Sequence, residues 1–279
     1  MGKANDSPEV SVRLLLDADT VTVRDMVCRG TCKHRSPEEC ATATHLVFPY
    51  RGVYVRHVGR QDAVAEANQV LFFNDAESYR ISHPVDGGDA CLSLGLSPQL
   101  LAELAPHDQV RGSYMPVFKE HRRRIDADAQ ALVARLRYGL LHNISDSLEA
   151  EDIAITLVRR ALGEQPMRAS PGRQKLVERA KLVLSSDPAR RWTLADIAAE
   201  VRVSPVYLTQ VFQQVEGMPL YRYQLRLRLA QALDLLGRAE DLSRLSLDLG
   251  FSSHSHFTSV FRQVYGRTPA DFRRSIRGH

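Results

Sequence analysis

The feature that most constrains this chain is an internal repeat near its C-terminus. The segment SPVYLTQVFQQVEGMPLYRY (204–223) aligns with SHSHFTSVFRQVYGRTPADF (253–272) at an offset of 49 residues, with seven of the twenty positions identical. Apolar residues recur in both copies at i, i+3, i+4 and i+7, the spacing of an amphipathic helix. These stripes are Leu208, Val211, Phe212 and Val215 in one copy and Phe257, Val260, Phe261 and Val264 in the other. A chance surface pattern does not repeat in register, so the sequence predicts two equivalent units.

Each copy follows a second, shorter amphipathic pattern. These patterns are TLADIAAEV (193–201), with Thr193 as N-cap, and DLSRLSLDL (241–249). The turn between the two patterns reads RVS in the first unit and GFSS in the second. Gly250 can supply a positive φ there, and Ser252 or Ser253 can cap the following helix. A short helix, a tight turn and a second helix together predict a helix-turn-helix.

The polar face of each second helix is suited to reading DNA. The major groove admits one α-helix, and short polar side chains, Gln or Arg near its leading end can reach base edges. We expect the base-reading residues to be Val206, Thr209, Gln210 and Gln213 in the first unit and His254, Ser255, Ser259 and Arg262 in the second. The apolar stretch 219–236 between them predicts one long helix that holds the two units about 34 Å apart, one turn of DNA. Arg222 and Arg226 lie one turn apart on it, where they can meet phosphates or simply face solvent.

The stretch from about Arg173 to Ile276 resembles the DNA-binding domain of the AraC/XylS family of transcription regulators. That family closes with the signature GF…S.F…F….G.TP..FR, and the matching residues here are Gly250, Phe251, Ser255, Phe257, Phe261, Gly266, Thr268, Pro269, Phe272 and Arg273. Two positions depart from the family pattern. Gln210 stands where many members have Arg, and Ser246 replaces the usual small Ala. The resemblance implies two helix-turn-helix units joined by a long helix.

Charge is divided unevenly along the chain. Seventeen of the 37 Lys and Arg residues but ten of the 33 Asp and Glu residues lie from Arg173 onward, a net charge of +7 there and −3 elsewhere. A basic C-terminal module beside a mildly acidic one fits a domain that binds phosphates, although any basic surface has the same balance. No apolar run approaches 18 residues, and no signal-peptide pattern opens the chain, so we expect a cytoplasmic protein without membrane contact.

The N-terminal part predicts β-structure. Alternating and apolar runs between Arg13 and Leu96 are broken by Gly, Pro, Asn and Asp every 8 to 12 residues, which indicates a sandwich or barrel. The family resemblance implies a cupin-like sensor barrel here. We therefore predict an α+β fold of two domains: a barrel over 1–120, a helical region over 121–165, a linker over 166–172 and an all-α DNA-binding domain over 173–279. The expected helices at 126–145 and 147–162 fit a dimer contact, as in the family, or a hairpin packed on the sheet within one chain.

An enzymatic role for the barrel is not expected. Metal-dependent cupins carry a His-x-His pair, a Glu and a further His, whereas His45, His57 and His83 each stand alone in this sequence. Tyr79 occupies about the place of the last metal ligand. These spacings do not assemble a two-His, one-carboxylate site, so we assign no catalytic residue.

Three cysteines crowd into one short segment. CRGTCKHRSPEEC places Cys28, Cys32 and Cys40 within thirteen residues, and Cys91 follows on a predicted strand. Their thiolates could surround zinc or another soft metal, with Cys91 or His34 completing the site. The cations Arg29, Lys33 and Arg35 would also lower a thiol pKa, which suits a redox sensor. Alternatively, Cys28 and Cys91 are core residues and the loop thiols have no role.

These patterns predict a sequence-specific transcription regulator. Its expected partners are a double-stranded DNA operator, a second copy of the chain in a homodimer, and RNA polymerase. The sequence does not say whether the chain activates or represses, or what its N-terminal domain senses. Two alternatives remain: a cupin-type metal-dependent enzyme fused to a DNA-binding domain, and a nucleic-acid adaptor that binds no effector.

Overall fold

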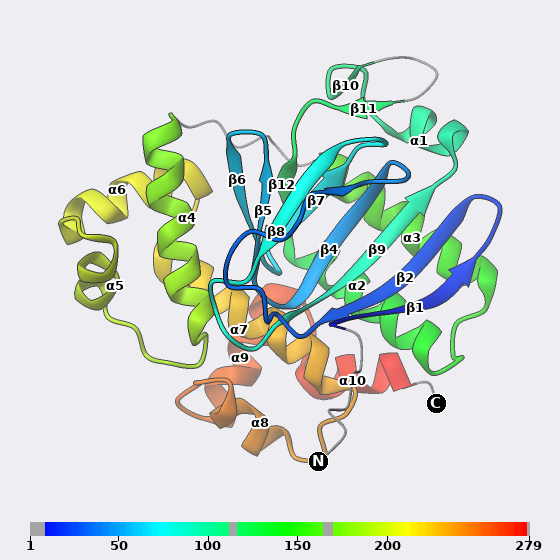
Figure 1. The fold of residues 1–279 in the computed structure, drawn as a ribbon. Helices are drawn as coiled ribbons and strands as arrows, with labels where there is room; N and C mark the ends of the chain where they lie inside the picture. The colour runs from blue at the N-terminus through cyan, green and yellow to red at the C-terminus, as the bar shows by residue number, and fades with distance from the viewer. Residues whose placement is uncertain (1–8, 112–115, 164–169, 278–279) are drawn as a thin grey trace, which may run out of the picture.

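The computed structural model describes residues 9–111, 116–163 and 170–277, and divides them into a β-rich N-terminal part and a helical C-terminal part (Figure 1). The strands are β1 (Val10–Asp17), β2 (Val21–Cys28), β3 (Glu39–Cys40), β4 (His45–Gly52), β5 (Tyr54–Val58), β6 (Gln61–Ala65), β7 (Gln69–Phe73), β8 (Ser78–Ser82), β9 (Asp89–Leu96), β10 (Val110–Arg111), β11 (Val117–Phe118) and β12 (Arg122–Arg124). The helices are α1 (Pro98–Leu104), α2 (Ala127–Leu141), α3 (Ser147–Gly163), α4 (Pro171–Ser186), α5 (Leu194–Val201), α6 (Pro205–Glu216), α7 (Leu220–Leu236), α8 (Leu242–Asp248), α9 (His254–Tyr265) and α10 (Pro269–Arg277). The predicted α+β fold class is confirmed.

Besides the two-stranded sheet β10-β11, two larger antiparallel sheets form the N-terminal domain. Their strand orders are β1-β2-β9-β4-β7-β12 and β3-β8-β5-β6. Side chains alternate across the six-stranded sheet, because successive residues of a strand point to opposite faces. Leu46 and Phe48 join the core beneath the helices, whereas Val47 between them joins the core shared with the four-stranded sheet. Cys91 belongs to that inner core, together with Tyr54 of the facing sheet.

Helices α2 and α3 pack against each other and cover the outer face of the six-stranded sheet. Ala150, Leu157 and Val158 of α3 are completely buried in that core. The intrachain hairpin considered from the sequence therefore accounts for the apolar stripes of both helices. Helix α2 also contacts α7, α9 and α10, so it lies between the barrel and the C-terminal domain (Figure 1).

The C-terminal domain contains two small cores that share the long helix α7. Tyr223 and Leu227 belong to the core around α4, α5 and α6, whereas Leu229 and Leu233 belong to the core around α8, α9 and α10. Helix α7 is apolar on several sides because each end serves a different bundle and its middle also contacts β4. With 17 residues, it is about 26 Å long at 1.5 Å per residue.

The linker expected over 166–172 falls mostly outside the described residues. Within the described part, Ser170 is the N-cap of α4 and Pro171 is its first residue. No helix among the described residues is long and apolar enough to cross a membrane.

Candidate DNA-binding surface and its link to the N-terminal domain

The first helix-turn-helix consists of α5 and α6. Thr193 and Asp196 form a capping box at the start of α5, and the Ser204 side chain accepts a hydrogen bond from Tyr207 N at the start of α6. Between them Arg202 adopts a left-handed conformation with φ of 58°. Gly217 ends α6 with φ of 66°. Local capping chemistry thus fixes both helices before tertiary packing is considered.

The second unit, α8 and α9, repeats this plan with one extra turn residue. In the first turn the Val203 N–H donates to Ala198 O, and in the second turn the Phe251 N–H donates to Ser246 O, so these equivalent residues are 48 positions apart. The N-caps Ser204 and Ser253 are 49 positions apart, so the second turn contains one more residue. Gly250 takes the left-handed position with φ of 79°, as expected from the sequence. Ser253 rather than Ser252 caps α9.

The two cores bury most of the predicted stripes, with Val260 and Val264 half-buried, and leave the predicted reading faces outside. Leu208, Phe212, Phe257 and Phe261 have no exposed surface. The eight predicted base-reading residues are all exposed: Val206, Thr209, Gln210, Gln213, His254, Ser255, Ser259 and Arg262. Ser246, which departs from the family pattern, is buried like its counterpart Ala198, and its hydroxyl donates to Ser243 O at 2.7 Å. Ser246 thus satisfies the same need for a small buried side chain that Ala meets in the family pattern.

The two arginines of α7 have different environments. Arg222 is exposed, and its Nε donates to the Tyr221 hydroxyl at 3.1 Å. Arg226 is half-buried and donates through Nη2 to Ile125 O of the N-terminal part at 2.6 Å. The expectation that Arg226 meets phosphates is thus corrected, because a backbone carbonyl of the other domain already engages its guanidinium.

The sequence patterns did not identify two further residues of the DNA-binding domain, Tyr207 and Arg228. Tyr207, 46% exposed, stands beside Val206, 67% exposed, at the leading end of α6, where both could contact a groove. Arg228 donates to the carbonyls of Pro188, Arg190 and Gly250 at 2.7, 2.9 and 3.1 Å. Since 188–190 precede α5 and Gly250 lies in the α8–α9 turn, Arg228 fixes one unit relative to the other. An Arg at this position gives no local sequence signal, because its partners are backbone carbonyls from distant segments.

A family model described as a helix-turn-helix domain matches residues 197–275. These residues form an AraC-type DNA-binding domain. Regulatory protein PocR of Salmonella typhimurium is 34% identical over 84 residues, 30% of this chain and 28% of that protein. The probable transcriptional regulator LumQ of Photobacterium leiognathi is 30% identical over 159 residues, 55% of this chain and 62% of that protein. The chain therefore spans less than two thirds of these curated relatives.

Among solved structures, an AraC-type DNA-binding-domain regulator from Chromobacterium violaceum is 31% identical and covers 37% of this chain and 94% of that chain, with a TM-score of 0.35.

Buried polar contacts connect the AraC-type domain to the N-terminal domain. Glu178 of α4 accepts two hydrogen bonds from the Arg122 guanidinium of β12, at 2.5 and 2.6 Å. The same carboxylate accepts from Val64 N of β6 at 2.7 Å. Burial alone would raise the pKa of Glu178, but the positive charges of Arg122 and Lys181 lower it to about 2. Glu178 is therefore ionised at neutral pH and holds the first unit to the barrel.

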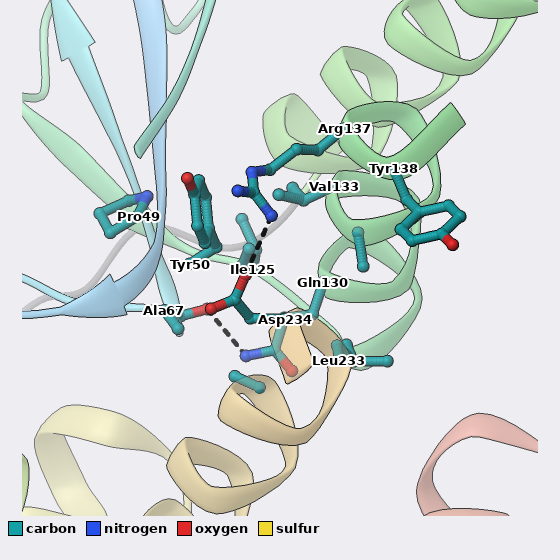
Figure 2. A pocket seen from close by; sticks show the side chains of 12 residues that line it. Pro49, Tyr50, Ala67, Ile125, Gln130, Val133, Arg137, Tyr138, Leu233 and Asp234 are labelled. Carbon is teal, nitrogen blue, oxygen red and sulfur yellow. Dashed lines mark hydrogen bonds and ion pairs between the residues drawn. The ribbon is translucent and has the colours of Figure 1, made fainter. Parts of the chain in front are cut away.

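A second polar contact with the N-terminal domain involves Asp234, in the last turn of α7 (Figure 2). Asp25 of β2 accepts hydrogen bonds from Arg137 of α2 at 3.1 Å and from Tyr50 at 2.6 Å. Arg137 also donates to Asp234 of α7 at 2.9 Å, beside Tyr50. These side chains border a small pocket between α2, α7 and β4. One arginine thus joins the sheet, the helical hairpin and the helix that carries both DNA-binding units.

The four cysteines do not gather into one site. All four are free thiols, and no three of them have sulfur atoms within 4.8 Å of one another in the described chain. Cys40 is exposed on β3, and the Cys32 thiol donates to His34 O at 2.8 Å. The prediction of one metal site made of all four cysteines is therefore wrong, because Cys40 lies on β3, in the opposite sheet from the strands of Cys28 and Cys91.

Two cations near the cysteines are paired with carboxylates. Lys33 pairs with Asp86, and Arg35 pairs with Asp62 at 3.2 Å. Burial raises the pKa of the Cys28 thiol, with a smaller opposite effect from the Gly30 N–H. Burial therefore opposes the activation of the Cys28 thiol that the cationic loop suggested.

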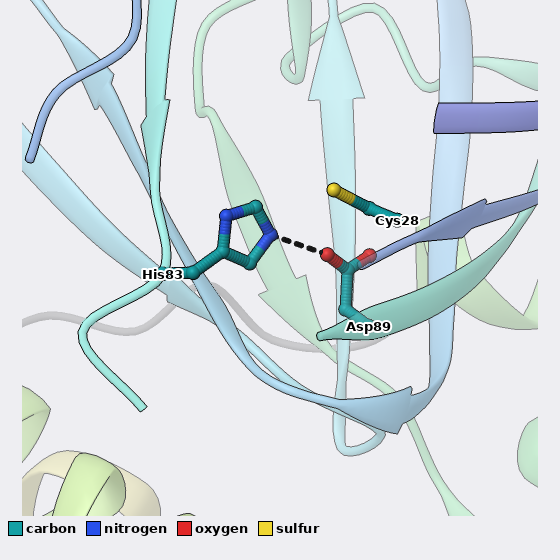
Figure 3. A group of neighbouring side chains, drawn as sticks. All are labelled: Cys28, His83 and Asp89. Atoms are coloured by element: carbon teal, nitrogen blue, oxygen red, sulfur yellow. Dashed lines mark hydrogen bonds and ion pairs between the residues drawn. The ribbon is translucent and has the colours of Figure 1, made fainter. Parts of the chain in front are cut away.

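A different group forms around Cys28 (Figure 3). Cys28, His83 and Asp89 offer ligand atoms that all lie within 4.8 Å of one another. His83 Nε2 and Asp89 Oδ1 are 2.6 Å apart, and Cys91 donates to the other oxygen of Asp89 at 3.2 Å. Sequence reasoning identified Cys28 and Cys91 but not their carboxylate and imidazole neighbours, which come from later strand ends.

Proposed function

We propose that this chain is a sequence-specific DNA-binding transcription regulator whose two helix-turn-helix units enter successive major grooves on one side of an operator. The observation that carries the proposal is the pair of exposed recognition faces, on α6 and α9, that one linking helix and Arg228 hold together. Two units joined rigidly would read half-sites about 10 base pairs apart, one turn of B-DNA.

The residue types suggest how bases are read. Gln210 can pair with adenine through its amide, and Arg262 can donate two hydrogen bonds to guanine. Val206 can contact the methyl group of thymine. Arg222 carries an exposed positive charge on α7 and would contact phosphate, which positions the protein without reading sequence.

Selection of DNA sequences from a random pool by the full chain tests the proposal. We expect an enriched motif of two half-sites spaced by about one helical turn, each protected in a footprint. Salt should weaken binding to every sequence, since phosphate contacts release counterions. Equal affinity for selected and random DNA would overturn the proposal and leave a non-specific nucleic-acid adaptor.

We propose that the N-terminal domain acts as the sensor through its buried contacts with α4 and α7. An open cleft runs between β5, β6, β12 and α4, and its lining includes both Arg122 and Glu178. Suppose that the first unit can take two positions relative to the N-terminal domain. An effector bound in the cleft would shift the unit from one position to the other only if it binds the two with different affinities. If a small molecule bound the chain without changing operator affinity, this coupling would be wrong.

Inside the barrel, the buried Arg56 guanidinium lies 3.7 Å from the centroid of Phe73 and donates to Phe72 O at 2.7 Å. Protein therefore fills this interior position, and Arg56 also lines the outer cleft.

We further propose a cytoplasmic homodimer that contacts RNA polymerase. Edge strand β1 supports a dimer, because Val10, Val12 and Leu14 are exposed along it and no strand of the described residues pairs with its outer backbone edge. Sedimentation of the wild-type chain and of Val12→Lys is the test. A wild-type monomer at the concentrations that occupy the operator would remove the dimer from the proposal.

The alternative of a metal-dependent cupin enzyme has little support. His45 stacks on Phe73, His57 contacts Asp62 and Ser82, and His83 contacts Asp89, so each histidine has a separate environment. The curated relatives named above are described as regulators. We therefore infer that the chain is not an enzyme.

A further inference from the structure

We propose that Cys28, His83 and Asp89 form a zinc site that joins the two sheets of the N-terminal domain. The ligand atoms lie within 4.8 Å of one another, so a small adjustment would bring all three onto one ion. Thiolate, imidazole and carboxylate are the three ligand types that Zn²⁺ takes in proteins, at about 2.0–2.3 Å. The fourth position is left to water or to a neighbouring thiol.

The three ligands come from segments that are far apart in the sequence. Cys28 ends β2 and Asp89 begins β9, and the two residues are direct partners in the antiparallel ladder. His83 follows β8, a strand of the opposite sheet. Its backbone N–H donates to Cys32 O at 2.7 Å, so the cysteine loop passes directly beside it. An ion held by this set would therefore cross-link the two sheets and the loop.

Two glycines allow the backbones of these segments to pack in direct contact. A Cβ on Gly88 would lie 2.2 Å from Cys28 O, and a Cβ on Gly30 would lie 2.6 Å from Gly88 Cα and 3.2 Å from a carbon of the His83 ring. Both glycines have positive φ, of 67° and 69°. The ligands are thus brought together by the backbone and not by flexible side chains reaching across a surface.

The His83 side chain is 4% exposed, so this imidazole lies inside the domain and not on its surface. Its Nε2 is the nitrogen that faces Asp89 (Figure 3), so Nε2 is the atom that would hold the ion. The Asp89 side chain is also buried, at 9% exposed, so a bound ion would neutralise a carboxylate that solvent hardly reaches.

The test uses the full chain, stripped with a chelator under reducing conditions and then given Zn²⁺ or Co²⁺ alone, without DNA. We expect one ion per chain, and a near-ultraviolet thiolate-to-cobalt band. Cys28→Ser should remove this band and weaken zinc binding at least about 100-fold, more than a lost outer-shell partner would. The matched control is Cys40→Ser, which removes an exposed thiol on β3 and should bind like the wild type.

A measurement on the wild-type chain keeps the test independent of variant folding. Bound zinc should protect Cys28 from alkylation, read by peptide mass spectrometry, while Cys40 reacts equally with and without the ion. No stoichiometric zinc in the wild type, an unchanged cobalt band in Cys28→Ser, or unprotected Cys28 would each overturn the proposal. None of these readouts involves DNA, so failure here leaves the proposed regulator function intact.

Discussion

The two helix-turn-helix units have the same local plan but are held in the molecule by different means. The first unit is attached through α4, where the buried carboxylate of Glu178 meets Arg122 of the barrel. The second is attached by apolar packing, with Ala131 of α2 in the same core as Phe257 and Phe261, and by the ion pair of Arg137 with Asp234 of α7. An ionic contact depends on charge and pH, whereas apolar packing does not. The two units therefore make chemically different contacts with the N-terminal domain.

The turns of the two units differ as well. Arg202 in the first turn is exposed and adopts the left-handed conformation with its side chain in solvent. Gly250 in the second turn lies against the segment before α5, where a Cβ would be 2.0 Å from Ala189 O. The second turn thus packs on the first unit, and only glycine fits there. Repeated sequence gives equivalent helices, but contacts between the repeats impose different requirements on each copy.

The largest expected effect comes from breaking the ionic attachment of the first unit. Glu178→Gln leaves the buried Arg122 without its partner charge, and we expect the free energy of unfolding to fall by about 3–5 kcal/mol at neutral pH. Glu103→Gln on the exposed face of α1 is the matched control and should change little. Denaturant unfolding measures both. An unchanged stability would show that Glu178 does not hold the domains together.

The same residue predicts a pH dependence. The pKa of Glu178 is about 2 in the folded chain, against about 4.3 in an unfolded chain. Its stabilisation is therefore fully present above about pH 4.3 and is lost as the pH falls toward 2. Unfolding measured between pH 5 and pH 2 should show a smaller acid-dependent loss for Glu178→Gln than for the wild type. Parallel curves would contradict the folded-state charge.

The second prediction compares the two turns directly. Gly250→Ala places a methyl group against Ala189 O and forces a positive φ on a residue that disfavours it, so we expect a loss of about 3 kcal/mol. Arg202→Gly makes the reverse change in the first turn and should alter stability by no more than about 1 kcal/mol. Thermal unfolding of both variants checks the difference. Equal effects would mean that the two turns are equivalent after all.

The third prediction concerns base reading by the two units. Gln210→Ala and Arg262→Ala should each cost about 1–3 kcal/mol of operator binding and relax specificity at a base contacted by the changed unit alone. Arg24→Ala, which removes an exposed charge on β2, is the control. Affinities for the operator and for single-base variants decide the result. If operator and random DNA weakened equally, the assigned faces would be wrong.

The smallest effect should come from the helix that joins the units. Arg222→Ala is expected to weaken binding to all DNA sequences alike and to reduce the slope of log affinity against log salt by about 1. Titrations at several salt concentrations measure this slope. A base-specific loss would instead place Arg222 in a groove.

Much of the DNA-binding surface followed from local patterns in the sequence. The apolar stripes, the caps at Thr193 and Ser253, and the exposed faces of α6 and α9 all lie where the 3.6-residue period put them. These features depend on residues within one helix or one turn of each other, so their spacing is sufficient to predict them. Strands β2 to β9 likewise lie within the span 13–96 for which β-structure was predicted.

Tertiary structure decided which side chains meet across those elements. Arg222 and Arg226 look alike in the sequence, yet a carbonyl of the N-terminal domain engages only Arg226. Clustered cysteines suggested a thiolate site, but sheet pairing separates Cys40 from Cys28 and instead brings Asp89 and His83 beside Cys28. Periodicity and capping act over a few residues and are written in the sequence directly. Strand pairing and domain contact join residues far apart in the sequence, as in Arg122 with Glu178, 56 positions apart, and Arg137 with Asp25, 112 positions apart. Which distant partners meet depends on the packing of the whole chain, and no local spacing encodes that choice.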